Sequence, residues 1–508
     1  MIRSIIILIA YSLILTAFAQ TNKIIVGNKS ISSPPPDYNV WYAGITTTGD
    51  GSGDSRANQI ALGSFNQAVI QPGDHIWLDD ALYTTASISI SKSGTPGNFI
   101  TWETDPNEPG QAHIRNMSIG ISIQNDSYIY FKNIKITNCG TGLRIDDIAN
   151  VIVFDSLYLH NNEYMYWAYG GCGGIGAGAN ISSCSGIDSI FIIDCYAVQD
   201  SQVNGQWDLF SAYGGQNNVF LIGNYIANLN TAGDTPDGQH VDCIQFSNYT
   251  GNIFYGNNFL KNICNYNSQI MMNGDSWNGY TSRFYNNVLS YYGVGIAQWA
   301  PTHEWSCVAG DDAPGQDTVI NNTFVGKASL STTEGTHFDY QDTLFYWNNI
   351  ASVADDCGPL WITAGVTRQQ EDCIPTSFVT NTLLPGTSFD YNLYHVAGES
   401  GVGPRVFGQS PTGCNTLTGW RTHTTSPDVN GISPSIVGFT DQINDNFSLI
   451  TGSAALNAGT DLESVITNWN IRHPVTGVLL IKWETFNNPY ISWSNPVPRD
   501  ATPSIGAW

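Results

Sequence analysis

One short phrase recurs through the middle of this 508-residue chain: an apolar run, a turn, and an Asn or Asp before another apolar residue. Repeats of about twenty to about forty residues are typical of solenoids, in which each unit buries its apolar face against its neighbours. The units are rich in β-forming residues and lack helical periodicity, so they predict the coils of a parallel β-helix. The recurring polar residues are Asp155, Asp194, Asn224, Asn257, Asn286, Asn322 and Asn348.

Alternation of apolar and polar residues sets several of these coils in register. Side chains alternate between the two faces of a strand, so one face of a shared sheet is predicted to point into the solenoid. The predicted inward residues are Ile121, Leu143, Phe210 and Ile244, and the predicted outward residues are Ser122, Arg144, Ser211 and Gln245.

The repeated Asn and Asp fall at a corner of each coil. A corner amide can hydrogen-bond the backbone of its own turn and the amide of the next coil, which satisfies groups that the bend removes from the sheet. We therefore interpret the predicted asparagine ladder as structural rather than as a binding site.

The net charge of the chain limits the classes of molecule that the protein is expected to bind. The net charge is −24, from 42 acidic and 18 basic residues, and the chain has no Lys/Arg run. Nucleic acid is therefore excluded as an expected partner, and a strongly anionic polysaccharide is disfavoured.

The N-terminus indicates export. Residues 1–19 have a basic start, a short apolar core and an Ala-x-Ala end, which is typical of a cleaved secretory signal. No segment is apolar and long enough to predict a membrane span, so we expect a secreted, extracellular or periplasmic protein. Export permits disulfides among the ten Cys, although Cys139, Cys195 and Cys243 lie in apolar strand phrases that suit buried thiols.

The chain is expected to form a single structural domain after the signal. Residues 20–56 are interpreted as a lead-in and residues 57–461 as the β-helix. A short capping helix is predicted over residues 57–69, and residues 462–508 are predicted to form a C-terminal capping segment.

Both ends of the predicted solenoid resemble a known superfamily. The phrase Gln71-Pro72-Gly73-Asp74 is followed by the strand His75–Leu78 and then by Ser93-Gly94-Thr95-Pro96-Gly97-Asn98, while Phe389–Tyr394 and Ala454–Asp461 have the form of closing coils. These phrases resemble secreted right-handed parallel β-helix proteins of the pectin-lyase-like superfamily. The resemblance implies an all-β fold and an extracellular polysaccharide partner, and it is unspecific for activity.

Two carboxylates are the candidate catalytic groups. In the predicted register, Asp208 and Asp242 precede equivalent strands of successive coils, and stacked strands are about 4.8 Å apart. A separation of about 5 Å suits a retaining glycosidase, in which the two carboxyl groups have different pKa values. His240 is a candidate to orient a carboxylate or to act as base. Predicted substrate-binding residues are Arg144, Trp207, Gln245 and Trp299.

The phrase Asp242-Cys243-Ile244 also resembles the Asp-Asp-Cys-Ile coil of polygalacturonases, which implies a catalytic acid at Asp242. The residue before it is Val241 rather than Asp, and the Gly-His-Gly and Arg-Ile-Lys phrases of that family are missing. The alternative interpretation is that these Asp residues have a structural role and cap turns.

Three functions therefore stay open. A carboxylate-based glycoside hydrolase is ranked first, because a lyase or epimerase acting on uronates needs a base and a neutralising cation. The third is a noncatalytic glycan-binding, adhesin or structural β-helix. No cofactor is indicated with certainty, calcium is left open, no zinc spacing is present, and the oligomeric state is undetermined.

Overall fold

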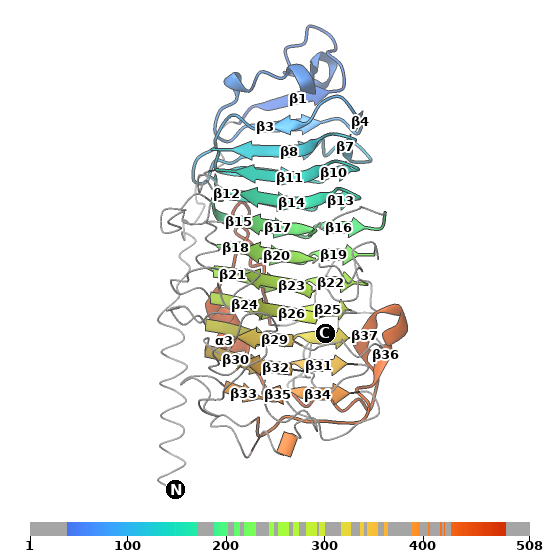
Figure 1. The fold of residues 1–508 in the computed structure, drawn as a ribbon. Coiled ribbons are helices and arrows are strands. Elements are labelled where there is room, and N and C mark those ends of the chain that lie inside the picture. Colours follow the sequence, from blue (N-terminus) through green and yellow to red (C-terminus); the bar gives the residue numbers. More distant parts are fainter. Residues whose placement is uncertain are drawn as a thin grey trace, which may run out of the picture.

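The computed structural model describes residues 38–147, 149–169, 187–201, 208–213, 218–229, 243–247, 252–263, 268–273, 281–291, 294–299, 316–326, 336–339, 343–353, 360–363, 388–396, 405–406, 417–418, 421 and 428–483. Their strands stack into three long parallel sheets, which we call A, B and C (Figure 1). Successive strands along the chain visit A, then B, then C, and each new coil pairs with the one before. The fold is a right-handed parallel β-helix, with the hand that parallel crossovers take.

Sheet A has thirteen strands. In spatial order they are β2 (Ile60–Ala61), β1 (Val40–Gly44), β3 (His75–Leu78), β6 (Ile100–Thr104), β9 (Ile129–Lys132), β12 (Ala149–Asp155), β15 (Ile187–Ile193), β18 (Val219–Ile222), β21 (Asn252–Gly256), β24 (Thr281–Tyr285), β27 (Gln316–Ile320), β30 (Thr343–Trp347) and β33 (Ser388–Asp390).

Sheet B has eleven strands, which follow those of sheet A along the chain. They are β4 (Leu82–Tyr83), β7 (Ala112–Arg115), β10 (Ile134–Thr137), β13 (Tyr158–His160), β16 (Tyr196–Gln199), β19 (Tyr225–Asn228), β22 (Phe259–Asn262), β25 (Val288–Tyr291), β28 (Thr323–Gly326), β31 (Ile350–Val353) and β34 (Leu393–Val396).

Sheet C completes each coil, also with eleven strands. They are β5 (Ile88–Ser89), β8 (Ile119–Gln124), β11 (Thr141–Asp146), β14 (Tyr164–Tyr169), β17 (Phe210–Tyr213), β20 (Ile244–Ser247), β23 (Ser268–Asn273), β26 (Val294–Trp299), β29 (Thr336–Asp339), β32 (Leu360–Thr363) and β35 (Arg405–Val406).

The predicted register of sheet C is confirmed. Ile121 pairs with Leu143, and Phe210 pairs with Ile244, and all four side chains are fully buried in the main core. Strand β14, which the alignment of repeats did not include, lies between β11 and β17.

The asparagine ladder is present at the corner between sheets A and B. Its members Asn224, Asn258, Asn287, Asn322, Asn349 and Asn392 are fully buried. At a typical rung, the Asn258 backbone N–H and Nδ2 both donate to Asn287 Oδ1 at 3.0 Å, and Nδ2 also donates to the Leu221 carbonyl at 2.9 Å. These amides replace the sheet hydrogen bonds that the bend interrupts, so the structural interpretation of the ladder is confirmed.

Asn-Asn pairs at this corner combine two roles. The first residue of each pair, such as Asn257 or Asn286, has a φ of 55° or 58° and makes the left-handed bend, which Asn tolerates better than most residues. The second, Asn258 or Asn287, is the ladder rung. The repeated polar residue seen in the sequence therefore marks the bend in some coils and the rung in others.

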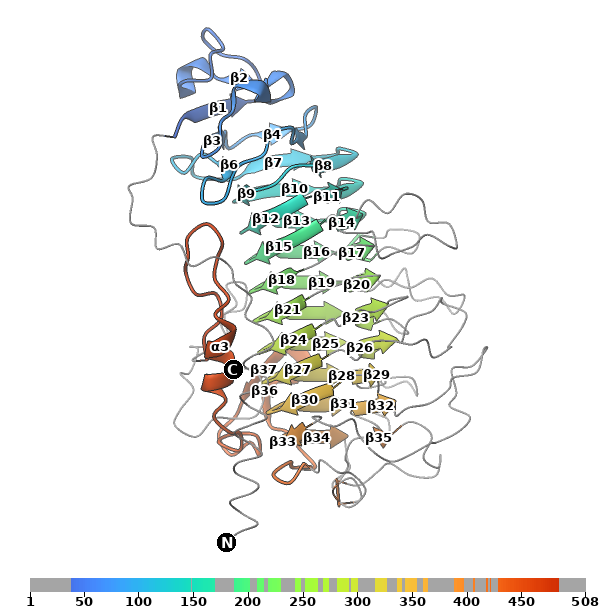
Figure 2. The ribbon, with the colours of Figure 1, turned by 90° about the vertical axis from the view of Figure 1, so that its left-hand side faces the viewer.

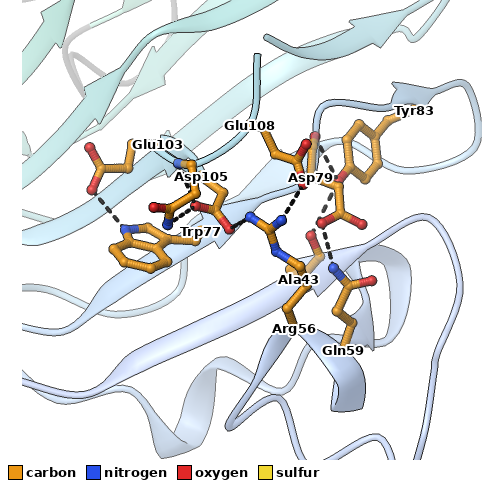
Figure 3. Close-up of polar contacts among 10 residues, drawn as sticks. Ala43, Arg56, Gln59, Trp77, Asp79, Tyr83, Glu103, Asp105 and Glu108 are labelled. Atoms are coloured by element: carbon orange, nitrogen blue, oxygen red, sulfur yellow. Dashed lines mark hydrogen bonds and ion pairs between the residues drawn. The ribbon is translucent and has the colours of Figure 1, made fainter. Parts of the chain in front are cut away.

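The N-terminal end is closed by short turns rather than by the single helix expected over residues 57–69. The turns η1 (Arg56–Asn58), η2 (Leu62–Ser64) and η3 (Gln67–Val69) flank the short strand β2. The Arg56 guanidinium pairs with Asp105 and with Glu108, the latter at 2.8 Å (Figure 3). Strand β1 pairs with β3, so sheet A begins at Val40, within the segment expected to be a lead-in.

The C-terminal region lies along the sides of the solenoid. A hairpin of β36 (Phe439–Asp441), η5 (Gln442–Asn444) and β37 (Asn446–Leu449) packs on the outer face of sheet B, where Lys261 Nζ contacts Asp445 Oδ2 at 2.7 Å. The short helix α3 (Glu463–Trp469) and the chain after it lie on the outer face of sheet A (Figures 1 and 2). We call residues 462–483 the C-terminal strap. The sequence predicts that this part of the tail closes an end of the solenoid. In the structure the strap instead covers the side of the solenoid.

Candidate functional site

The outer face of sheet C carries a column of polar and aromatic side chains. Register pairing places Ser122, Arg144, Trp167, Ser211 and Gln245 side by side on successive strands. Ser211 is fully buried and Gln245 is 2% exposed, whereas Trp167 is half-buried and the Arg144 side chain is 42% exposed. The predicted outward residues therefore share one face, on which Arg144 and Trp167 are partly exposed while Ser211 and Gln245 are buried.

Asp208 reaches this face from the bend before β17. Its Oδ2 accepts a hydrogen bond of 3.4 Å from Ser211 Oγ, and the residue is only 3% exposed. The contact with Ser211, an outward residue, shows that Asp208 sits at the bend and projects away from the apolar core. A carboxylate with so little contact with water interacts strongly with neighbouring charges, because the surroundings screen it poorly.

The Tyr164 ring lies close enough to this carboxylate to interact with its charge, and Trp167 packs on Tyr164. The Met165 and Tyr166 amides both donate to the Leu209 carbonyl, at 2.9 and 3.1 Å, a local irregularity of the kind that re-aims a strand side chain. Tyr164 packs edge-to-face on Trp167 with ring centroids 4.6 Å apart. Burial, reinforced by the negative charges of Asp208 and Glu163, raises the pKa of Tyr164 to about 12.

Together these residues offer a half-buried aromatic surface with two carboxylates near the Tyr164 hydroxyl. The Tyr164 phenol keeps its proton at neutral pH and can act as a hydrogen-bond donor. Arg144 lies one strand from Trp167, and its Nε donates to Asp146 Oδ2 at 2.7 Å. This arrangement can hold an apolar sugar face against rings while polar groups contact its hydroxyls.

Several predicted residues cannot be placed. Trp207, His240 and Asp242 lie outside the described residues, and Trp299 lies at the end of β26 without a described side chain. Their predicted roles stay predictions. The backbone nearby agrees with the predicted register: Phe210 N–H donates to the Cys243 carbonyl at 3.1 Å, so Cys243 lies one coil from Leu209.

Sequence reasoning missed Glu163, Tyr164 and Trp167. All three belong to β14 or the residue before it, the strand that was left out when the coils were aligned. The available signal was the alternation around Tyr166, which is fully buried and pairs with Leu143. Setting that strand in register would have placed Trp167 next to Arg144.

Within the described residues, the structure shows buried thiols and no group of side chains arranged to bind a metal ion. Cys139 and Cys195 are buried free thiols whose pKa burial raises, and Cys243 is also buried. The other seven Cys, including those considered for disulfides, lie outside the described ranges. Over those same ranges no group of three or more His, Cys, Asp or Glu is arranged to hold a metal ion, and no helix is long and apolar enough to cross a membrane.

Comparison with known proteins gives likenesses at low identity. No protein-family model and no curated protein matches the chain. Among solved structures, pectate lyase Pel9A is 13% identical with a TM-score of 0.36, covering 92% of this chain and 96% of its own. A rhamnogalacturonan lyase is 12% identical with a TM-score of 0.40, covering 85% and 99%. The GH136 lacto-N-biosidase from Eubacterium ramulus is 11% identical with a TM-score of 0.38, covering 77% and 67%.

At these TM-scores the likenesses carry no argument, so the assignment of fold rests on the chain's own sheets and corners. Three parallel sheets visited in turn, with a buried asparagine ladder at one corner, define it. The chain is a right-handed parallel β-helix, the fold implied by the resemblance of its sequence to the pectin-lyase-like superfamily.

Proposed function

We propose that this protein is an exported glycoside hydrolase that cleaves an extracellular polysaccharide along the outer face of sheet C. One observation carries the proposal: Asp208 is an almost fully buried carboxylate that projects to this face near the half-buried Tyr164 ring, on which Trp167 packs. Glycoside hydrolysis requires two carboxyl groups next to a surface that binds sugar rings.

In this proposal Asp208 is one catalytic carboxyl group and Asp242 is the second. Asp242 is chosen because the confirmed pairing of Ser211 with Gln245 is the register on which its prediction depends. Glu163 is the described alternative, since its charge acts on the same phenol as that of Asp208. Trp167 and Tyr164 would hold a sugar ring, and Gln245 and Arg144 would contact its hydroxyl groups.

The test is an incubation of the mature protein with xylan, glucomannan, galactomannan and polygalacturonate. Release of reducing ends and ultraviolet absorbance of unsaturated products are followed together. We expect reducing ends without absorbance, and a loss of at least about a hundredfold in kcat for Asp208→Asn and Asp242→Asn, because each removes a catalytic carboxyl group. Trp167→Ala is expected to raise KM more than it lowers kcat.

Asp80→Asn is the matched control, because Asp80 is exposed and lies between β3 and β4, several coils from β17. Full activity of Asp208→Asn would overturn its role, and loss of activity in Glu163→Gln but not in Asp242→Asn would move the second role to Glu163. Absorbance would identify a lyase instead. Binding without any cleavage would identify a noncatalytic glycan-binding module.

A further inference from the structure

The apolar cluster that the C-terminal strap forms with the outer face of sheet A includes no side chain of β1 or β3, at the N-terminal end of the sheet. His473 of the strap packs edge-to-face on Tyr130 of β9, with ring centroids 5.5 Å apart, and its Nε2 lies 3.3 Å from Asp155 Oδ2. Below this contact the strap covers apolar side chains that include Val153, Phe191 and Phe220. Tyr42 and Trp77, on β1 and β3 beyond it, belong to none of the buried core clusters of the described chain.

The part of the face outside this cluster has a different chemical character from the part that the strap covers. Register pairing places Tyr42, Trp77, Glu103 and Lys132 in one outward column across β1, β3, β6 and β9. Tyr42 and Trp77 are half-buried and pack edge-to-face with centroids 5.5 Å apart, and Lys132 is exposed. Two partly exposed rings are thus followed by a carboxylate and an ammonium group.

Glu103 is held in a fixed position against these rings. Its Oε1 accepts a hydrogen bond of 2.9 Å from Trp77 Nε1 and lies 3.1 Å from His75 Nδ1. The side chain is 15% exposed, and within the described chain its Oε2 accepts no hydrogen bond. Figure 3 shows one carboxylate oxygen directed at the Trp77 ring nitrogen and the other directed away.

Because the contacts of Oε1 fix the carboxylate, Oε2 is a preorganised acceptor. A ligand that donates a hydrogen bond to Oε2 therefore costs the Glu103 side chain little conformational entropy. Lys132 lies on the neighbouring strand, as the register partner of Glu103, and forms no ion pair with a described residue. The column therefore offers an acceptor, a donor and aromatic rings within a few strand spacings.

We propose that Tyr42, Trp77, Glu103 and Lys132 form a second binding site for a neutral saccharide, separate from the face of sheet C. A pyranose ring has an apolar C–H face that packs on an indole or phenol ring, and its hydroxyl groups both donate and accept hydrogen bonds. Glu103 Oε2 would accept from one hydroxyl group and Lys132 Nζ would donate to another. A neutral sugar is favoured over an anionic one because the carboxylate adjoins the rings and the chain carries a net charge of −24.

The two sites lie on different faces of the solenoid, so a polymer held at Trp77 would leave sheet C free. The choice of a saccharide is strengthened by the proposed function but does not require cleavage. Binding and cleavage are therefore measured separately, so that either proposal can fail alone.

The experiment measures binding of xylohexaose, cellohexaose and mannohexaose by isothermal titration calorimetry in the full-length mature protein carrying Trp167→Ala, which weakens the proposed sheet C site. In this background we expect Trp77→Ala to weaken binding of one of these hexasaccharides by at least tenfold. Trp77→Phe should keep most of the affinity, because it keeps an aromatic ring. Melting temperature is measured for every variant.

Lys132→Ala keeps the test decisive if Trp77→Ala fails to fold, because Lys132 is exposed. It should weaken binding about threefold to tenfold, as expected for the loss of one hydrogen bond at an exposed position. Lys482→Ala is the matched control, since Lys482 is an exposed lysine of the strap on the same face of sheet A. It should bind as tightly as the parent.

Three outcomes would overturn the inference. They are unchanged affinity in both Trp77→Ala and Lys132→Ala, no binding of any of the three hexasaccharides, and a change in oligomeric state with Trp77→Ala that shows the patch to be a contact between copies of the chain. Loss of binding with Trp77→Ala in a protein that cleaves no polysaccharide would support this site while contradicting the proposed hydrolase.

Discussion

Asp428 shows how one residue closes the asparagine ladder. Its Oδ2 accepts hydrogen bonds of 2.8 Å from Asn392 Nδ2 and 2.9 Å from Tyr394 Oη, so it takes the place of a further rung. The side chain is fully buried, and among the described residues its Oδ1 has no hydrogen-bond partner. Burial raises the pKa of Asp428 to about 7, although the bonds from Asn392 and Tyr394 oppose this rise.

Asp428→Asn should make stability less dependent on pH. A carboxyl group whose pKa is raised by folding stabilises the folded state fully below its ordinary pKa, and this contribution is lost as pH rises through about 7. We expect the wild type to lose on the order of 1 kcal/mol from this group between about pH 6 and about pH 8, a loss absent from the variant. Urea unfolding at the two pH values measures the difference, with Asp80→Asn as control. Equal losses in wild type and Asp428→Asn would contradict the argument.

The C-terminal strap is the element that covers apolar side chains on the outer face of sheet A. Trp469 packs edge-to-face on Phe254 and Tyr285, with centroids 5.5 and 5.9 Å apart, and its ring lies 6.0 Å from the Arg283 guanidinium. Burial lowers the pKa of Arg283 to about 10. At the far end of the strap, hydrogen bonds from His473, Tyr130 and Ser156 hold the pKa of Asp155 below its ordinary value, although burial opposes them.

Trp469→Ala should loosen the strap while leaving the coils intact. We expect a loss of about 2–4 kcal/mol in the free energy of unfolding, because the half-buried indole contacts two rings and a buried cation. Hydrogen exchange should become faster in residues 462–483 and stay unchanged in β11 on sheet C. Val478→Ala is the control, since Val478 is 58% exposed. Unchanged exchange in the strap of Trp469→Ala would show that Trp469 does not hold it in place.

The whole molecule carries a strong negative field, which affects the choice of polymer. With a net charge of −24, an anionic glycan is repelled before it reaches any groove unless salt screens the repulsion. Sheet C offers Arg144 as a cation, but its Nε is already bound to Asp146. The long-range electrostatic repulsion therefore favours the binding of neutral glycans over anionic ones.

Salt should change the affinity for an anionic polymer and leave the affinity for a neutral polymer almost unchanged. Raising the salt concentration from about 20 mM to about 200 mM should strengthen any binding of polygalacturonate, because the screening length shortens severalfold. Binding of a neutral xylan or glucomannan should change by less than about twofold. Affinity electrophoresis in gels containing each polymer measures both. Weaker polygalacturonate binding at higher salt would instead reveal a local basic groove.

The sequence by itself determined the fold, the register of sheet C and the corner ladder. Each of these depends on a local pattern repeated coil after coil, as in Ile121, Leu143, Phe210 and Ile244, and stacking can satisfy such a pattern in only one way. The prediction that Asp208 lies at a bend was also within reach, because a buried carboxylate among Ile and Phe would be too costly.

Only the tertiary structure decided where the strap lies and which side chains surround Asp208. His473 contacts Tyr130 and Asp155, which both lie more than three hundred residues earlier in the chain. His473 and Asp155 are 318 positions apart. The Tyr164–Trp167 pair depends on an irregularity at Met165 that strict alternation does not predict. The contacts of His473 depend on the complementary shapes of segments distant in sequence, and no repeat period encodes them.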